Sequence, residues 1–466
     1  MHPSPVLLVH GYSDSGAAFA PWRDRLLAQG IDARAIRIAQ WRSLADEITL
    51  ADLAEGFDRA LRDPAGVPDG GPFRVIAHSA GALVVRAWLA ARPEQRARLT
   101  HFVGLGPAHF GSPLAHKGRS FVGMVAKGNR ALGEDFLEVG DRILDALELA
   151  SPTTWQLAHQ DLLDPAVAHP LGRWSYTICG TGSLAWPVAA VTDAAGTDGV
   201  VRWAGSAADA RKLTVDLTRT GRDRVRIDGV RPRDVPMAFV PDRHHGELLA
   251  RPTGALAEMV GEALAVGSEA EDAAWRAKWV GRHTPREGWQ QLLVRVRDER
   301  GAPVPDYHLE FEATDRAGVR TRLIEVASDV HRHRADPSRR AFHVRLRDVR
   351  RSTIAGLRLK IVARSGSSAV GYRGIGRAEG AGWDGVIDLT AAWPDREVAL
   401  FWPFTTTLIE IVLDREPLPF SGENGVVRML RRSPAASAEI RVASGHLVSK
   451  PWATRPGAPS KSCVVL

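Results

Sequence analysis

The stretch RVIAHSAGAL places Ser79 between an apolar run and an apolar helical segment. Residues 74–77 have the pattern of a buried strand, and residues 82–89 that of a helix. A serine on such a sharp turn exposes its hydroxyl and faces the positive end of the helix dipole. Small residues two positions away on each side, Ala77 and Gly81, suit a turn where strand and helix approach closely. The stretch predicts a nucleophile elbow; the alternative is a core strand followed by a helix with a serine cap.

Strand-like and helix-like segments alternate on both sides of this turn. Strands are expected at residues 5–9, 35–38 and 99–105, and helices at residues 21–29 and 52–62. This alternation predicts a parallel sheet covered by helices on both faces. Sites in such sheets lie at the carboxyl ends of the strands, where both the loop from His10 to Gly16 and Ser79 are expected.

Composition excludes several other classes of protein. An apolar content of 44% and a charged content of 25% over 466 residues are typical of a soluble globular chain of two or three domains. The net charge is +7, and the basic residues are scattered among acidic ones rather than gathered on one face, so we expect no nucleic-acid partner. The two cysteines, Cys179 and Cys463, indicate a reducing compartment, and no signal peptide is apparent, so we expect a cytoplasmic location.

Three motifs, VLLVHGYSDSG, RVIAHSAGALVVR and VGLGPAHFGSPLA, follow one another in this order. Together they resemble the α/β-hydrolase fold, and within it the bacterial lipases and lipase-like esterases. The resemblance implies that Ser79 is the nucleophile. It also implies that the backbone N–H groups of Tyr12 and Ala80 form the oxyanion hole, which stabilises the charge of the tetrahedral intermediate.

The resemblance also indicates the other two catalytic residues. Asp198 lies in the segment GTDGVV and matches the position of the acid; an ordinary Asp-Gly turn is the alternative reading, and Asp193 is a weaker candidate acid. His245, followed by a small residue and an acid, matches the base. His244 remains an alternative base, because a shift of one residue decides which ring faces Ser79. The order Ser, Asp, His is that of the family.

The chain divides into three parts by composition. Residues 1–285 form the expected hydrolase domain, in which residues 114–172 are a lid-like insertion or, alternatively, a packing helix pair. Residues 286–430 carry repeated short strands with turn signals, which predict a smaller all-β sandwich. We expect residues 1–288 to fold and to act without it. His331 and His333 form an H-x-H pair with no third ligand apparent, so no metal site is expected.

The remaining residues, 431–466, read as a flexible basic tail ending in CVVL. This ending resembles a prenylation box with Cys463 as the lipidated residue. Lys450, Arg455 and Lys461 would add attraction to an anionic membrane surface. The modification needs a eukaryotic transferase, so a bacterial source would imply delivery into a host cytosol by a non-Sec route.

The function that the resemblance implies is hydrolysis of carboxylic esters, in particular lipid esters, through an acyl-enzyme on Ser79. The class covers lipases, esterases and phospholipases. No cofactor is expected. Two alternatives stay open: a catalytically silent hydrolase scaffold that acts as a binding module, and an acyltransferase that uses the same three residues.

Overall fold

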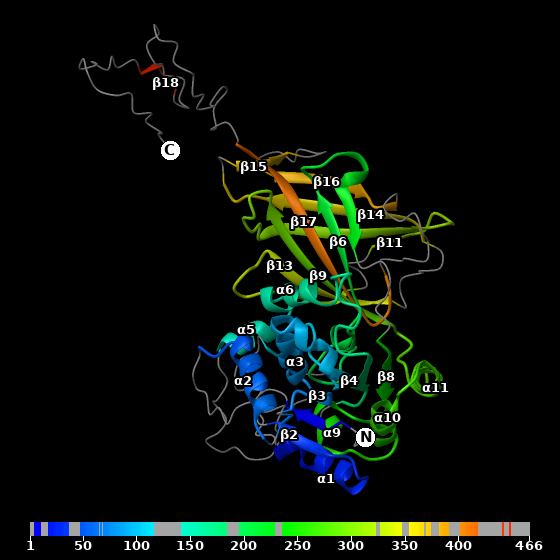
Figure 1. Cartoon of the computed structure of the whole chain (residues 1–466). Coiled ribbons are helices and arrows are strands. Elements are labelled where there is room, and N and C mark those ends of the chain that lie inside the picture. The colour runs from blue at the N-terminus through cyan, green and yellow to red at the C-terminus, as the bar shows by residue number, and fades with distance from the viewer. Residues whose placement is uncertain are drawn as a thin grey trace, which may run out of the picture.

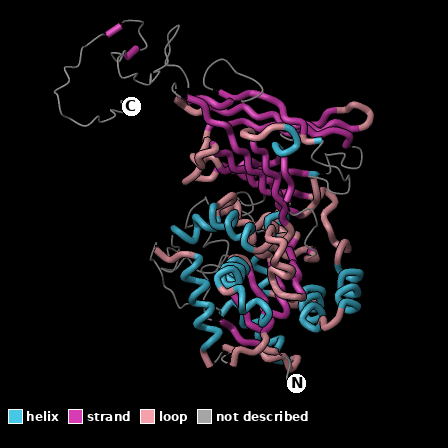
Figure 2. Tube along the Cα trace, turned by 45° about the horizontal axis from the view of Figure 1, so that its top comes forward, coloured by secondary structure: helices cyan, strands magenta, loops and turns pink. Residues whose placement is uncertain are grey.

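The computed structural model assigns secondary structure over most of the chain. The described residues are 4–10, 17–36, 47–64, 66–67, 69–115, 141–183, 195–228, 235–322, 327–346, 354–367, 370–373, 382–390, 401–417, 440–441 and 447–448. Figure 1 shows a helix-containing half at the N-terminal end and a β-rich half stacked on it. Figure 2 shows the same two halves by secondary structure.

A parallel sheet of six strands, in the order β2-β1-β3-β4-β5-β8, forms the centre of the first half. Its strands are β1 (Val6–Val9), β2 (Ala33–Ile36), β3 (Phe73–His78), β4 (Leu99–Leu105), β5 (Trp174–Gly180) and β8 (Met237–Val240). Every residue of β1 and β3 is buried, as expected for strands covered on both faces. The predicted parallel sheet is therefore confirmed.

Helices cover both faces of this sheet, because successive residues of a strand point to opposite sides. Leu7 and Val9 pack in one core with residues of α2 (Leu50–Arg62) and α3 (Gly81–Ala91). Val6 and Leu8 pack in another core with residues of four further helices. These are α1 (Ala20–Ala28), α9 (His245–Ala250), α10 (Ala255–Ala265) and α11 (Glu269–Trp279). Short 3-10 helices lie at Ala17–Phe19, Pro93–Arg98 and Gly221–Arg224.

The expected lid-like insertion contains two described helices, α5 (Asp141–Leu147) and α6 (Pro152–Gln160). α6 lies where the two halves meet (Figure 1). Just beyond α6, Asp161 forms a buried ion pair with Arg86 of α3. Residues 116–140 lie outside the described part, and a gating role for the insertion stays a prediction.

Two sheets form the second half. One has the order β12-β13-β9-β17-β6-β7, with β15 also paired to β17, and the other has the order β11-β10-β14-β16. The strands are β6 (Ala210–Asp216), β7 (Val225–Asp228), β9 (Trp289–Asp298), β10 (Asp306–Asp315), β11 (Arg320–Arg322), β12 (Ala327–Arg332), β13 (Arg339–Arg345), β14 (Ile354–Arg364), β15 (Val370–Arg373), β16 (Gly382–Asp388) and β17 (Thr405–Pro417). Apolar side chains of both sheets share one core, so the predicted sandwich is confirmed.

Strands β6 and β7 depart from the domain boundary expected near residue 285. β6 lies within the expected hydrolase range, yet it pairs in parallel with β17, from Ala210 opposite Thr406 to Asp216 opposite Val412. Leu213 and Val215 of β6 are fully buried in the sandwich core. The first half therefore contributes two strands to the second half, and no single cut separates them. Residues 1–288 would keep β6 and β7 but lack β17, the other neighbour of β6. Independent folding and activity of residues 1–288 stay a prediction.

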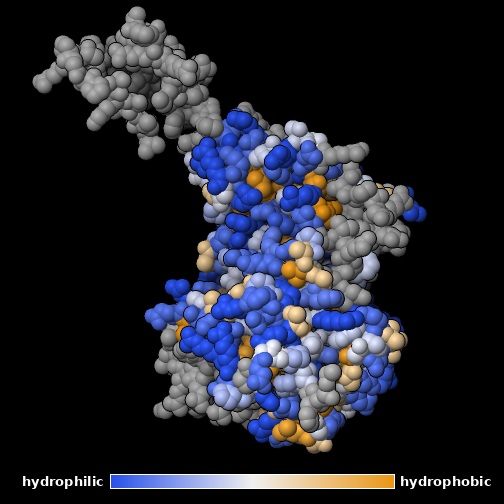
Figure 3. Space-filling view, viewed as in Figure 1, coloured by the Kyte–Doolittle hydropathy of each residue, from blue (hydrophilic) through white to orange (hydrophobic). Residues whose placement is uncertain are grey.

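Three smaller observations complete the fold. A separate pair of strands, β18 (Ile440–Arg441) and β19 (Leu447–Val448), lies within the expected tail. Over the described residues, no helix combines the length and apolar character needed to cross a bilayer. The face of the molecule in Figure 3 is mainly hydrophilic, with small scattered apolar areas.

Candidate active site

Ser79 lies on the turn between β3, which ends at His78, and α3, which begins at Gly81. Its φ of 53° is in the left-handed region, which a non-glycine residue adopts only when its surroundings hold it there. The Ser79 N–H donates to the Leu105 carbonyl at 3.1 Å, and the Ser79 carbonyl accepts from the Ala108 N–H at 3.1 Å. The half-buried serine is thus fixed against the end of β4.

The start of α3 lies directly against the end of β1. A Cβ atom at Gly81 would lie 2.5 Å from the Val9 carbonyl oxygen and 2.7 Å from that of His10. Only glycine allows this approach, which is the steric reason for the small residue after Ser79. The chain therefore leaves β1 beside the N-terminus of α3, where the Ala80 N–H lies. Tyr12, the other expected oxyanion residue, lies outside the described residues.

Asp198 and His245 form a buried pair. The Asp198 Oδ2 accepts from the His245 Nδ1 at 2.7 Å, and both side chains are at most 3% exposed. The Asp198 Oδ1 accepts from the backbone N–H groups of Val200 and Val201, at 3.0 and 2.8 Å. The His245 N–H also donates to the Asp198 carbonyl at 2.9 Å. The carboxylate is therefore fully hydrogen-bonded, and it orients the imidazole with Nε2 facing away from it.

Gly106 brings this pair to the same strand end as Ser79. A Cβ atom at Gly106 would lie 2.7 Å from the Asp198 Oδ2 and 2.8 Å from the His245 Nδ1. The preceding residue, Leu105, accepts the backbone hydrogen bond of Ser79. The structure thus gathers Ser79, Asp198 and His245 around the carboxyl end of β4, as the topology of a parallel sheet predicts.

His78 is a residue of this site that the sequence analysis missed. Its Nε2 donates to the His245 carbonyl at 3.2 Å, and the two rings lie 4.5 Å apart between centroids. Burial, and then the neighbouring His245, lower the pKa of His78 well below the ordinary imidazole value. His78 is therefore neutral at pH 7 and fixes the backbone of His245 through one N–H. Its position beside Ser79 in the sequence was the available signal.

The two candidate bases differ in their contacts. His244 is the N-cap of α9, and its Nε2 lies 3.7 Å from the Glu247 carboxylate rather than against Asp198. Burial lowers the pKa of the His244 imidazole. His245, one residue later, enters the interior and contacts Asp198. The alternative acid, Asp193, and the lipidation residue, Cys463, lie outside the described residues.

Metal ligands do not gather in the part of the chain that the structure describes, where no group of three or more His, Cys, Asp or Glu residues could hold an ion. His331 and His333 instead face the carboxylate of Glu148, at 2.8 and 3.6 Å. These contacts join the two halves of the molecule, because Glu148 follows α5 and the histidines belong to β12 and the turn after it.

Lipidation at Cys463 stays a prediction.

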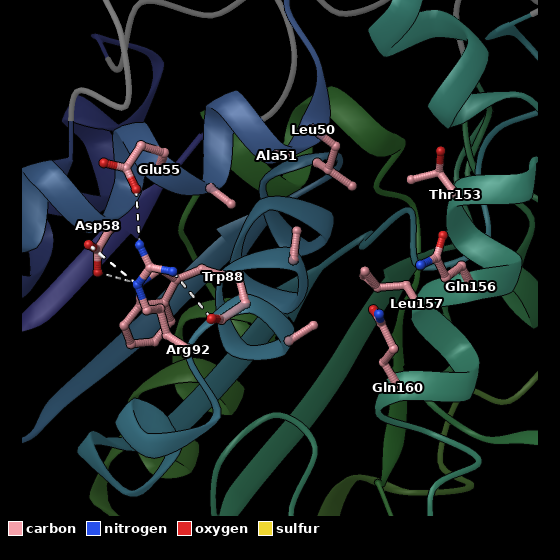
Figure 4. Close-up of a pocket in the computed structure, with 14 residues that line it drawn as sticks. Leu50, Ala51, Glu55, Asp58, Trp88, Arg92, Thr153, Gln156, Leu157 and Gln160 are labelled. Carbon is pink, nitrogen blue, oxygen red and sulfur yellow. Dashed lines mark hydrogen bonds and ion pairs between the residues drawn. The ribbon is translucent and has the colours of Figure 1, made fainter.

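A pocket of about 320 Å³ opens between α2, α3 and α6, toward the C-terminal end of α3 (Figure 4). Arg92 reaches across its wall to Glu55 and Asp58. Ser79 does not line this pocket, since it lies at the other end of α3. The pocket is therefore separate from the candidate active site.

Comparison with known proteins gives a likeness of fold. No family model and no curated protein sequence matches the chain. Among solved structures, phospholipase PlaB from Legionella pneumophila superposes with a TM-score of 0.72 over 96% of this chain and 100% of that one, at 21% identity. PlaB in complex with thio-NAD gives the same values. Lipase BlEst2 from Bacillus licheniformis in mature form matches 44% of this chain and 80% of that one, at 18% identity and a TM-score of 0.34.

The PlaB match spans both halves. The superposition with PlaB therefore extends over the parallel sheet, its helices and most of the β-rich half. At this level of identity the likeness shows a shared architecture: the chain has the α/β-hydrolase fold, followed by and interleaved with a β-sandwich.

Proposed function

We propose that the chain is a serine hydrolase that cleaves carboxylic esters, with Ser79 as nucleophile, His245 as general base and Asp198 as the residue that orients it. The single observation that carries this proposal is the buried hydrogen bond of 2.7 Å between Asp198 and His245. The Asp198–His245 bond lies against Gly106, and the residue before it, Leu105, accepts the backbone hydrogen bond of Ser79. A buried carboxylate on the far nitrogen of an imidazole, together with a serine on a strand-to-helix turn, is the arrangement that activates a hydroxyl.

The proposed reaction gives each of these groups one role. The Ser79 hydroxyl attacks the ester carbonyl carbon while the His245 Nε2 takes its proton. Asp198 holds the Nδ1–H and stabilises the imidazolium that forms. Negative charge on the carbonyl oxygen meets the Ala80 N–H at the start of α3, and we assign the second donor to the Tyr12 N–H. His245 then returns the proton to the leaving alcohol, and water releases the acyl group by the same steps in reverse.

Lipid esters, and phospholipids in particular, are the substrates that we infer. This part rests on the architecture shared with PlaB, which is a phospholipase, and on the lipase-like motifs around Ser79. A panel of p-nitrophenyl esters from short to long acyl chains, assayed beside phospholipid vesicles, measures the preference. Turnover of short soluble esters alone would restrict the proposal to an esterase.

The test of the catalytic assignment compares four proteins in ester hydrolysis and in labelling by a fluorophosphonate, which reacts only with an activated serine. Ser79→Ala is expected to lose labelling and nearly all hydrolysis. His245→Ala is expected to lower kcat by about 10⁴-fold or more, on the scale seen when a triad member is removed. His244→Ala is the matched control and should stay close to the parent. Retention of the parent rate by folded Ser79→Ala, or equal small losses in both histidine variants, would contradict the assignment.

A further inference from the structure

Backbone hydrogen bonds join the two ends of the loop that carries Asp198, residues 196–204. Thr197 and Arg202 form an antiparallel bridge, and the Trp203 N–H donates to the Gly196 carbonyl at 3.0 Å. Asp198 lies inside this closure, where its own N–H donates to the Val201 carbonyl at 3.2 Å. Contacts that hold Arg202 in place therefore also hold the backbone of Asp198 in place.

The side chain of Arg202 extends from this loop to the sandwich and contacts residues of two of its strands. It is fully buried and forms an ion pair with Asp329 of β12. Its Nη1 donates to the Gln291 Oε1 of β9 at 3.4 Å. Burial lowers the pKa of Arg202 to about 10, so the guanidinium is charged at neutral pH and Asp329 is its counter-ion. The Arg202 guanidinium has little freedom to move, because a buried charge that leaves its counter-ion is left without compensation.

Other residues of the sandwich hold the same loop at its two ends. The Thr406 hydroxyl of β17 donates to the Ala204 carbonyl at 3.1 Å. At the other end, a Cβ atom at Gly196 would lie 2.5 Å from the Trp289 ring and 2.7 Å from the His343 ring. Residues of β9, β12, β13 and β17 thus contact the loop at both ends and at Arg202.

We propose that the β-sandwich is a positioning part of the active site, and that the Arg202–Asp329 ion pair holds the loop so that Asp198 stays within hydrogen-bond reach of His245. Neither residue touches the substrate; both act through Asp198. This inference rests on the proposed function. Small displacements of an orienting group lower the rate steeply, by about 100-fold for 1 Å. An ion pair across the two halves therefore couples the sandwich to catalysis.

The first test is Asp329→Asn, which keeps the shape of a side chain that is 48% exposed but removes the charge. We expect kcat for a soluble ester to fall by about 10- to 100-fold with KM within about twofold, because orientation of the base rather than binding is affected. Asp329→Glu should recover part of kcat. Asp145→Asn is the matched control, since it breaks the Arg334–Asp145 ion pair across the same interface at 2.9 Å without contacting the loop. The control should keep the parent kcat.

A second variant covers the case in which Asp329→Asn does not fold. Thr406→Val removes only the hydroxyl that donates to Ala204 and keeps the side-chain volume. It should lower kcat by several-fold at constant KM. Parent kcat in the folded variants would overturn the inference.

A double-mutant cycle then asks whether the effect runs through Asp198. In an Asp198→Ala background the orienting carboxylate is absent, so Asp329→Asn should lower the residual rate no further. A full, multiplicative loss in that background would overturn the inference, because the sandwich would then act by another route. Ser79→Ala separates the two proposals. If Ser79→Ala keeps its activity, the proposed function fails. If Ser79→Ala is inactive but Asp329→Asn matches the parent, only the positioning role fails.

Discussion

Positive backbone angles at two residues bring the candidate catalytic groups together. Ser79, with φ of 53°, turns the chain sharply from β3 into α3. Gly106, with φ of 50°, turns it just after β4 and leaves the space that the Asp198–His245 pair occupies. Glycine adopts this conformation without steric cost, whereas tertiary contacts must hold Ser79 in it.

Gly106→Ala tests this spatial requirement. The added methyl group would meet the Asp198 Oδ2 and the His245 Nδ1 at 2.7 and 2.8 Å, closer than real contacts allow. We expect ester hydrolysis to fall by at least about 100-fold, because the pair must separate. The measurement is kcat with a soluble ester, beside the melting temperature.

Gly221→Ala is the control for backbone strain. Its φ is 61°, but a Cβ atom there would meet nothing within 4 Å. It should lose about 1 kcal/mol of stability and keep its activity. Equal losses of activity in the two glycine variants would mean that strain, and not displacement of the pair, is responsible.

At the scale of elements, α3 connects the elbow to the inserted segment. The Arg86 Nε and Nη2 donate to the two carboxylate oxygens of Asp161 at 2.8 and 3.0 Å, and neither side chain is more than 1% exposed. The Arg86 Nη1 also donates to the His109 carbonyl at 2.8 Å, in the loop that contacts Ser79. One buried guanidinium thus joins α3, the end of the insertion and the loop after β4.

Asp161→Asn should destabilise the fold strongly. It leaves the buried Arg86 without a counter-ion, which costs about 3–5 kcal/mol. The free energy of unfolding in urea measures the loss. Glu269→Gln is the control, because it breaks the Arg173–Glu269 pair, whose side chains are 61% and 78% exposed. That change should cost less than about 1 kcal/mol. Similar losses of unfolding free energy in both variants would show that the buried Arg86–Asp161 pair contributes no more to stability than the exposed pair.

At the scale of the whole molecule, buried histidines make stability depend on pH. Burial lowers the pKa of His78, His109 and His343 well below the ordinary value of about 6.5. Below that value the unfolded chain takes up protons that the folded chain excludes. The stabilisation from these neutral histidines is therefore present above pH 6.5 and is lost as the pH decreases. The slope approaches about 1.4 kcal/mol per pH unit for each histidine well below pH 6.5.

Urea unfolding at pH 7.5, 6.5 and 5.5 measures this slope. His109→Leu should remove about 1.4 kcal/mol of the loss between pH 7.5 and 5.5, since neither ring nitrogen of His109 has a hydrogen-bond partner within the described part of the chain. His283→Leu, at an exposed position, is the control and should leave the slope unchanged. A slope that is the same in the parent and in His109→Leu would contradict the buried, neutral state of this ring.

The sequence predicted the class of both halves, because their local patterns are strong. Continuous apolar runs separated by helices indicated the parallel sheet, and alternating runs from Trp289 onward indicated the sandwich. It also singled out Ser79, Asp198 and His245, whose catalytic roles remain predictions. It missed the membership of β6, because this strand precedes the alternating runs from Trp289 onward and lies within the range expected for the hydrolase domain. Only the pairing with β17 decides it.

What the sequence determined by itself is therefore local: which segments form strands or helices, and where a turn is tight enough to need a small residue. What only the tertiary structure decided depends on residues far apart in the chain. Asp198 meets His245 rather than His244, His78 holds the His245 carbonyl, and Arg202 finds Asp329, 127 positions later. Such contacts depend on the packing of the sheets, and no local pattern of residues specifies that packing.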